Sequence, residues 1–353
     1  MNISLTLRQR QTQTRTFLCS ILFVLLFVLS GCPASVEPVK EPLYSLPNGF
    51  PDINFPKDNP VTAEKIELGR KLFYDPILSS DKSIACASCH KQELAFTDGK
   101  IVSRGVKGEL GSRNSPTIVN TGYAEHLFWD GRASTIEEQA FAAATNPAEM
   151  RAVESVIDVR LQKDSAYSIE FPRAFGNGTQ PTLRLAMKAI ATFVRTVLSG
   201  SSRYDEFIHG ATSALNESEI RGRDLFFSYR TQCGDCHSGY NFTDNQFHST
   251  GLFTHYFDQG RYNFTINKSD VGKFKTPSLR NIALTAPYEH DGHLPTLEAV
   301  IEHYNEGGKD FINKDSRIRP LNLTETEKKD LIAFLNTLTD NSLLNNPRFA
   351  KKP

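Results

Sequence analysis

The chain has 353 residues, a length typical of about two domains and sufficient to bury substantial cores. Lysine plus arginine and aspartate plus glutamate each number 40, so no charge bias points to nucleic acid or to an acidic lipid surface as a partner. Hydrophobic residues make up 39% of the chain, which excludes a disordered protein and little else.

The amino terminus has the pattern of a bacterial export signal. Several arginines precede an apolar run over residues 17–29, which is too short to cross a bilayer comfortably and suits a signal-peptide core. The run ends in Leu-Ser-Gly-Cys, which resembles a lipoprotein box; the alternative is an ordinary signal peptide whose cysteine is incidental. We expect residues 1–31 to be removed and Cys32 to carry lipid, giving a periplasmic, membrane-anchored lipoprotein.

Residues 32–60 are rich in proline and lack helical periodicity, so we expect a tether and an irregular lead-in. The next helix, capped by Thr62, places Gly69, Leu72 and Phe73 on one face. The same Gly-Arg-x-Leu-Phe pattern returns at residues 222–226. This internal repeat indicates two related domains.

A C-x-x-C-H motif follows each copy of that pattern, at residues 86–90 and 233–237. The motif attaches c-type haem: each cysteine sulfur adds across one vinyl group, and the histidine is placed to bind the iron. The alternatives are a structural zinc site, which needs four converging ligands, or a redox disulfide, which does not need the histidine. We therefore expect two covalently bound haem c groups, held by Cys86, Cys89, His90, Cys233, Cys236 and His237.

The remaining helical patterns place the domain boundary. Residues 183–198 form a long amphipathic pattern that closes the first domain, and a Ser-Gly-Ser-Ser stretch follows it. Asn216 with Glu219, and Thr324 with Glu327, predict capping boxes in the second domain. We expect a mostly α fold of two cytochrome c-like haem domains packed against each other, spanning residues 61–212 and 213–345.

The second axial ligand of each iron decides its chemistry. Electron-transfer haems commonly use methionine, but the methionines of the mature chain, Met150 and Met187, both lie in the first domain. The second haem therefore has no methionine ligand from its own domain. The candidates in that domain are His248, His255, His290, His293, His303 and Tyr304.

Helical periodicity distinguishes the last two candidates. Over residues 296–304, Tyr304 shares an apolar face with Val300 and Ile301, whereas His303 points about 100° away. A stripe that faces the haem would offer the tyrosine. Periodicity alone leaves Tyr304 as either an iron ligand or a buried core residue.

Several longer stretches carry a more specific signature. They are Gly-Arg-Lys-Leu-Phe-Tyr-Asp (69–75), Arg-Asn-Ser-Pro-Thr (113–117), Phe-Trp-Asp-Gly-Arg-Ala (128–133), Glu-Gln-Ala (138–140), Asn-Pro-Ala-Glu-Met (146–150), Pro-Ser-Leu-Arg-Asn-Ile-Ala-Leu-Thr-Ala-Pro-Tyr (277–288) and His-Asp-Gly (290–292). With the paired haem motifs, they resemble the bacterial di-haem cytochrome c peroxidase and MauG family over nearly all of residues 60–340.

The resemblance implies a role for individual residues. His90 would be the proximal ligand of a peroxidatic haem, and His237 that of an electron-transfer haem whose second ligand is Tyr304, as in MauG-type members. It also implies a calcium site between the domains, formed by Asn114, Thr285 and Pro287.

Three further residues would serve catalysis. Trp129 matches the tryptophan between the haems, Gln139 and Glu149 match the distal pocket, and the Glu149 carboxylate would move the protons of peroxide. Without the resemblance, Trp129 would be assigned to core packing and Glu149 to the surface.

Two departures from the family pattern affect the peroxidatic haem. Reductively activated members carry a histidine in the loop before Arg-Asn-Ser-Pro, and it blocks the iron; residues 102–108 contain no histidine. The family also often has proline six residues before the distal glutamate, where this chain has Ala143.

The expected function is that of a di-haem peroxidase that reduces hydrogen peroxide at the N-terminal haem with electrons relayed from the C-terminal haem. The expected electron donor is a small periplasmic cytochrome c or cupredoxin, nucleic acid is not a partner, and a homodimer is compatible with this interpretation. The alternatives are a MauG-like enzyme that oxidises residues of a partner protein and a non-catalytic electron carrier.

The first prediction concerns covalent modification. Intact mass of protein extracted from membranes should show two haems and a lipid, because two attachment motifs and a lipoprotein box are present. Substitution of Cys32 should release soluble enzyme. A mass that corresponds to one haem or none would contradict the assignment of both motifs.

Overall fold

The computed structural model describes residues 42–352, and the chain from Leu43 onward forms one compact unit. The predicted signal peptide and Cys32 lie outside the described residues. The described part of the predicted tether, residues 42–60, is irregular, as expected. No helix within residues 42–352 combines the length and the apolar character needed to cross a membrane.

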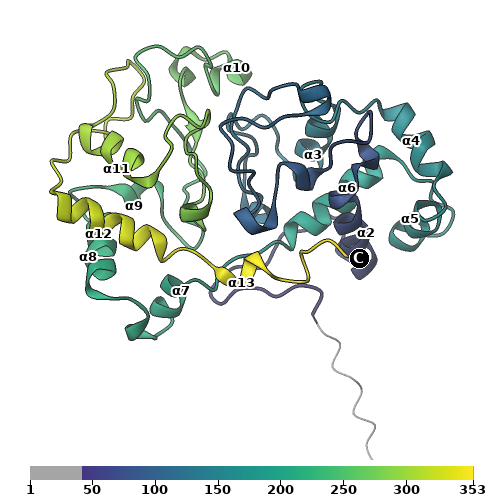
Figure 1. The fold of residues 1–353 in the computed structure, drawn as a ribbon, viewed down its shortest axis with the longest axis horizontal. Coiled ribbons are helices and arrows are strands. Elements are labelled where there is room, and N and C mark those ends of the chain that lie inside the picture. The colour runs from purple at the N-terminus through teal and green to yellow at the C-terminus, as the bar shows by residue number, and fades with distance from the viewer. Residues whose placement is uncertain (1–41, 353) are drawn as a thin grey trace, which may run out of the picture. The chain divides into compact units, whose positions relative to one another are not determined.

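The fold is mostly helical, which confirms the expected class, and the described residues contain one small antiparallel sheet (Figure 1). The α-helices are α2 (Ala63–Tyr74), α3 (Ile136–Thr145), α4 (Glu154–Lys163), α5 (Tyr167–Phe175), α6 (Leu183–Arg195), α7 (Arg203–Ile208), α8 (Glu217–Phe226), α9 (Cys233–Cys236), α10 (Tyr262–Thr265), α11 (Leu297–Glu306), α12 (Glu325–Asn336) and α13 (Asn341–Leu344). The strands are β1 (Phe247–His248) and β2 (Phe274–Lys275). The 3₁₀ turns are η1 (Pro76–Leu78), η2 (Cys86–Ser88), η3 (Gln92–Leu94), η4 (Val106–Gly108), η5 (Thr121–Tyr123), η6 (Thr212–Ala214), η7 (Lys268–Asp270) and η8 (Ile282–Leu284).

An N-terminal lobe is built on α2 to α6, and its core is one cluster of buried apolar side chains. The Thr62 hydroxyl caps α2 by accepting a hydrogen bond from the amide of Lys65, at 3.2 Å. Helix α6 ends at Arg195, before the expected residue 198. The reason is tertiary, because the Val197 carbonyl accepts a hydrogen bond from the amide of Asn120 (3.0 Å).

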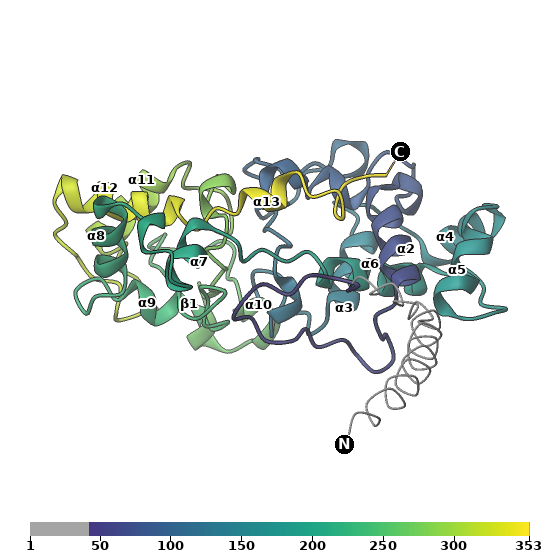
Figure 2. The same ribbon diagram turned by 90° about the horizontal axis from the view of Figure 1, so that it is seen from below.

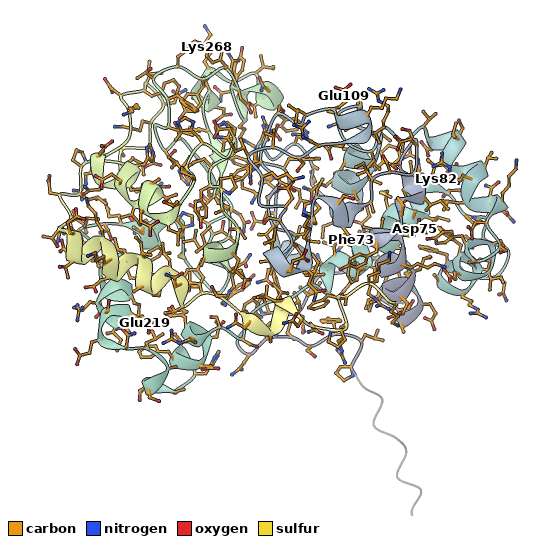
Figure 3. All side chains as sticks on the ribbon, viewed as in Figure 1. Phe73, Asp75, Lys82, Glu109, Glu219 and Lys268 are labelled. Atoms are coloured by element: carbon orange, nitrogen blue, oxygen red, sulfur yellow. The ribbon has the colours of Figure 1, made fainter. Side chains whose placement is uncertain are left out.

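A C-terminal lobe is built on α8 to α12 around a second apolar cluster. Both predicted capping boxes are present, Asn216 with Glu219 at α8 and Thr324 with Glu327 at α12. Helices α8 and α12 lie side by side, as do α2 and α6 in the other lobe (Figure 2). Figure 3 marks these two helix pairs through Glu219 on α8 and Phe73 on α2.

The repeated glycine lets each helix pair approach closely. A Cβ atom added to Gly69 would collide with the carbonyl oxygen of Ala189 on α6. A Cβ atom added to Gly222 would collide in the same way with the carbonyl of Asp330 on α12. The repeat therefore encodes the same helix crossing twice, since a residue without a side chain is required at both contacts.

The two lobes are joined by a reciprocal pair of backbone hydrogen bonds. The Asn114 amide donates to the carbonyl of His290, and the Lys275 amide donates to the carbonyl of Trp129, both at 2.8 Å. The Arg113 guanidinium also bridges the lobes, since it donates to Asp258. The predicted boundary near residue 212 stays a prediction. Tyr204, before it, packs on the C-terminal cluster, and Leu343 and Phe349, at the end of the chain, belong to the N-terminal cluster.

A second prediction follows from the glycine crossings. Gly222→Ala should destabilise the protein by about 1–3 kcal/mol, because the new methyl group forces α8 away from α12. Urea denaturation should show a lower midpoint, whereas Glu217→Ala, at an exposed position of the same helix, should leave it nearly unchanged. Equal midpoints for Gly222→Ala and the native protein would contradict the close crossing.

Candidate haem sites

Both C-x-x-C-H motifs open into one cavity of about 940 Å³. All four cysteines and both histidines of the motifs line it, together with apolar side chains of both lobes. The four thiols are free, so none is committed to a disulfide among the described residues. A covalently attached haem requires two thiols for its vinyl groups, an imidazole for its iron and apolar walls around its ring, and the cavity provides all three.

Each motif histidine is held in the same way. The amide of His90 donates to the Cys86 carbonyl and that of His237 to the Cys233 carbonyl, at 3.0 and 2.9 Å. The Nδ1 atoms lie 3.0 Å from the carbonyl oxygen of Phe96 and 3.2 Å from that of Phe242, respectively. Since Nδ1 is occupied, Nε2 is left for iron.

Burial favours the neutral form of both imidazoles. Desolvation lowers the pKa of His90 and of His237 below the ordinary histidine value, although the nearby backbone carbonyls act in the opposite direction. A neutral imidazole is the form that binds iron. The residues present therefore fit two c-type haems with proximal histidines.

In the N-terminal lobe, Glu149 faces the cavity at the end of the Asn-Pro-Ala-Glu segment. Its carboxylate accepts a hydrogen bond from the Asn146 side-chain amide at 2.7 Å. Burial raises the pKa of Glu149, although Asn146 and the charge of Arg132 act to lower it. A raised pKa favours the protonated carboxyl group, which is the form that can donate a proton.

Helix α3 supplies the wall beside Glu149. Gln139, Ala140, Ala143 and Ala144 all line the cavity, so this wall carries one amide and otherwise methyl groups. The structure thus brings Gln139 and Glu149, both predicted site residues, to the same cavity.

The loop without histidine is packed against the Glu149 segment. The Val106 side chain is buried, and its amide donates to the Glu149 carbonyl at 2.8 Å. A Cβ atom at Gly105 would collide with the backbone carbonyls of Ala148 and Glu149. The loop therefore supports the Glu149 backbone, and it presents no imidazole to the cavity.

The two lobes repeat a loop that sequence reasoning missed. An isolated antiparallel bridge joins Leu127 to Ala133 before α3, and an equivalent bridge joins Tyr288 to Leu294 before α11. Each loop turns at a glycine with positive φ and is followed by a threonine that caps the next helix. The signal in the sequence was the repeated Asp-Gly dipeptide at equal spacing from each Thr cap.

Counted from those caps, Tyr304 on α11 occupies the position of Ala143 on α3. Both residues line the cavity. The C-terminal lobe therefore presents a phenol at this position, and the N-terminal lobe presents a methyl group.

Tyr304 faces the cavity on the same side of α11 as Val300 and Ile301, as the periodicity predicted. Burial raises its pKa well above the ordinary tyrosine value, and the charge of Glu289 adds to that effect. The neighbouring His303 is turned away, with Nε2 3.0 Å from the Thr250 carbonyl. Tyr304 is thus a protonated phenol in the protein alone, and a metal ion must displace that proton to bind the oxygen.

Trp129 belongs to the N-terminal lobe but packs against the C-terminal cluster of Leu252, Tyr256 and Phe274. Its indole Nε1 donates to the Asn114 carbonyl at 2.9 Å. Trp129 also lines the cavity, so it lies at the boundary of the two lobes. Its predicted place between the two haems stays a prediction.

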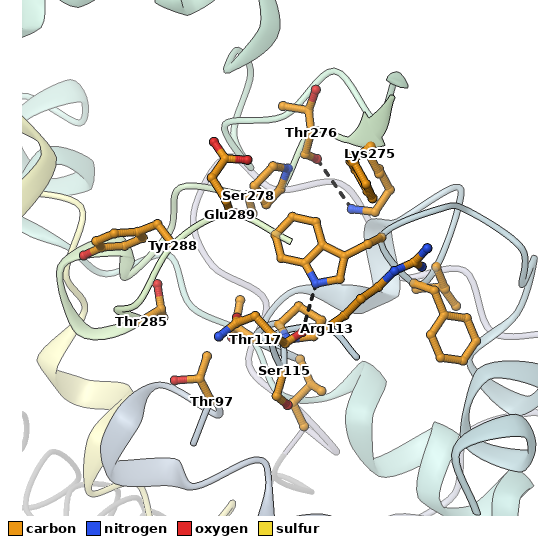
Figure 4. Close-up of a pocket in the computed structure, with 18 of the residues that line it drawn as sticks. Thr97, Arg113, Ser115, Thr117, Lys275, Thr276, Ser278, Thr285, Tyr288 and Glu289 are labelled. Atoms are coloured by element: carbon orange, nitrogen blue, oxygen red, sulfur yellow. Dashed lines mark hydrogen bonds between the residues drawn. The ribbon is translucent and has the colours of Figure 1, made fainter. Parts of the chain in front are cut away.

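The three residues predicted to bind calcium line the same cavity. Asn114 uses its side-chain amide to donate to the Lys100 carbonyl at 2.8 Å. Thr285 and Pro287 follow η8, and Figure 4 shows Thr285 among the lining residues near Tyr288. A calcium site at this place stays a prediction.

Sequence reasoning missed two ionisable residues in the cavity, Lys275 and Glu289 (Figure 4). Burial raises the pKa of Glu289 to about 7, with a further contribution from Asp291, and lowers that of Lys275 to about 8. Both lie beside the family stretches 277–288 and 290–292 but outside them, so the sequence held no signal for either residue.

Comparison with known proteins agrees with this geometry. Residues 63–213 match the family described as di-haem cytochrome c peroxidase. The chain is 37% identical to cytochrome-c peroxidase IdrP1 of Pseudomonas sp. strain SCT, over 89% of both chains. It is 38% identical to methylamine utilization protein MauG of Methylorubrum extorquens, over 80% of both.

A solved structure shows the same fold. A crystal structure of a MauG-like protein associated with microbial copper homeostasis is 39% identical to this chain. It superposes with a TM-score of 0.83 and covers 87% of this chain and 98% of its own.

Proposed function

This chain belongs to the di-haem cytochrome c peroxidase family, and from that premise we propose that it reduces hydrogen peroxide in its N-terminal lobe with electrons relayed through its C-terminal lobe. The overall reaction consumes one peroxide, two electrons and two protons and yields two waters. Two covalently bound haems supply the redox-active iron when they are attached. The protein residues must leave one iron open, move the protons and carry the electrons.

The proposal rests on a difference between equivalent positions of the two lobes, Tyr304 on α11 and Ala143 on α3. Tyr304 has a phenol oxygen to offer as a second iron ligand, whereas Ala143 has only a methyl group at the equivalent place. The loop of residues 102–108 contains no histidine, so it offers no imidazole to block the iron of the N-terminal lobe. Peroxide would therefore bind in the N-terminal lobe.

Glu149 is the proposed proton carrier. Its raised pKa lets it take a proton from the attacking oxygen of peroxide and return it to the leaving oxygen. The Asn146 amide orients the carboxylate through its 2.7 Å hydrogen bond, and Gln139 on the adjacent wall is placed to orient the peroxide.

The remaining assignments concern electron entry and location. Trp129, at the lobe boundary, is the proposed electron route, and a calcium ion at Asn114, Thr285 and Pro287 would fix that boundary. The proposed donor is a small cytochrome c or cupredoxin in the periplasm, with the enzyme anchored through lipid on Cys32. The export pattern and the lipoprotein box of the sequence support that location.

A second candidate is a MauG-like enzyme that oxidises residues of a partner protein. The likeness to MauG and to the MauG-like crystal structure favours it, and so does the placement of Tyr304. Steady-state peroxide consumption with a reduced small cytochrome tests the first function, and a mass change on a partner protein tests the second. An inactive protein in both assays would instead support an electron carrier.

A third prediction tests the proton carrier. Glu149→Gln should retain both haems but slow peroxide turnover by about 10²–10⁴-fold, the usual contribution of an acid–base group. Glu109→Gln is the matched control, because that side chain is 55% exposed and lies in the adjacent loop. Turnover of Glu149→Gln at the native rate would assign proton transfer to Gln139 or to water.

A fourth prediction concerns activation. Resting, fully oxidised enzyme mixed with stoichiometric peroxide in a stopped-flow spectrometer should change its haem absorbance rapidly, without prior reduction, because no histidine closes the N-terminal site. Tyr304→Phe should alter the spectrum of the C-terminal haem, whereas Tyr229→Phe, at an 88% exposed side chain, should not. A reaction that begins only after one electron is supplied would contradict the open site. An unaltered Tyr304→Phe spectrum would remove Tyr304 from the iron.

A further inference from the structure

Lys275 places a half-buried cation in the cavity between the lobes. It ends β2, and its backbone amide makes one of the reciprocal pair of backbone hydrogen bonds between the lobes. Its side chain lines the cavity that both haem motifs share. In Figure 4 a dashed line connects its ammonium to the Thr276 carbonyl, a contact of 3.5 Å at the limit of a hydrogen bond.

The ammonium group lacks a counter-ion within residues 42–352. No carboxylate in that range forms an ion pair or a hydrogen bond with Lys275 Nζ. Asp244 is the acidic group whose charge acts on it, but the Asp244 carboxylate is engaged with the ring of His248 at 2.9 Å. An ammonium held largely out of water without a counter-ion is unfavourable, so we expect an anion from outside the chain to bind it.

The contacts around Lys275 connect it to the C-terminal motif. The carbonyl of Thr276, next in the chain, accepts a hydrogen bond from Thr243 at 2.7 Å. The amide of Asp244, which follows Thr243, donates to the Cys236 carbonyl at 2.8 Å. Lys275 therefore lies on the wall of the C-terminal haem site.

We propose that Lys275 binds a propionate of the C-terminal haem and that its charge raises the reduction potential of that haem. A haem bears two carboxylates, and a charge-assisted hydrogen bond from a buried ammonium is the interaction that would compensate both partners. A fixed positive charge beside the haem favours the reduced iron, which carries one positive charge less.

The equivalent position of the N-terminal lobe carries no charge. In the reciprocal pair of backbone bonds, Asn114 occupies the place of Lys275, and its neutral amide is bonded to the Lys100 carbonyl. The neighbouring Arg113 also lines the cavity, but its guanidinium is paired with two carboxylates. Lys275 is therefore one difference between the two sites that would separate their reduction potentials.

Potentiometric titration of the holoprotein, followed by haem absorbance, tests the proposal. Lys275→Met should shift the potential of one haem downward, and Lys275→Arg should restore most of it. Lys268→Met is the control, because that lysine is exposed, and it should leave both potentials at the native values. Lys275→Gln keeps a polar side chain without the charge, so it should show the same downward shift as Lys275→Met.

Unchanged potentials in Lys275→Gln, with both haems attached, would overturn the proposal even if Lys275→Met did not fold. Haem attachment gives a second readout through mass analysis of peptides that contain each motif. If a variant loses a haem, it should lose the one attached at Cys233 and Cys236. Loss of the haem attached at Cys86 and Cys89 instead would also overturn the proposal.

Discussion

Each lobe depends on one close approach of two helix backbones, which glycine alone permits. Gly69 meets the Ala189 carbonyl, and Gly222 meets that of Asp330. A short connection leads from each of these helices to a haem motif, so the position of the helix constrains where the cysteines and histidine of the motif face the cavity. A side chain at either glycine would move a haem attachment site as well as a helix.

On this duplicated frame, two pairs of equivalent positions in the cavity carry different side chains. Ala143 and Tyr304 occupy equivalent places on α3 and α11, so one lobe presents a methyl group where the other presents a phenol. Asn114 and Lys275 each donate a backbone hydrogen bond across the boundary, to the carbonyls of His290 and Trp129, and only Lys275 brings a charged side chain. The two lobes therefore repeat the same backbone arrangement at these positions but present different side chains to the cavity.

Local signals made much of this predictable from the sequence. The caps at Thr62, Asn216 and Thr324 depend on neighbouring residues, and the face of Tyr304 depends on helix periodicity, so all were placed correctly. The end of α6 was not, because a distant amide, that of Asn120, binds the Val197 carbonyl. The burial of Lys275 was also hidden, since it depends on how the lobes meet and not on its neighbours in the chain.

The buried ionisable groups connect the fold to its cofactors. Burial lowers the pKa of Lys275 to about 8 and raises that of Glu289 to about 7. Burial also raises the pKa of Tyr304 well above its ordinary value. Each shift means that the cavity disfavours the charged form of the group. An anion beside Lys275 and a cation at Tyr304 would reverse that penalty, and haem supplies both as propionate and iron. Because such compensation exists in the folded state alone, attachment of the haems must stabilise the fold that positions them.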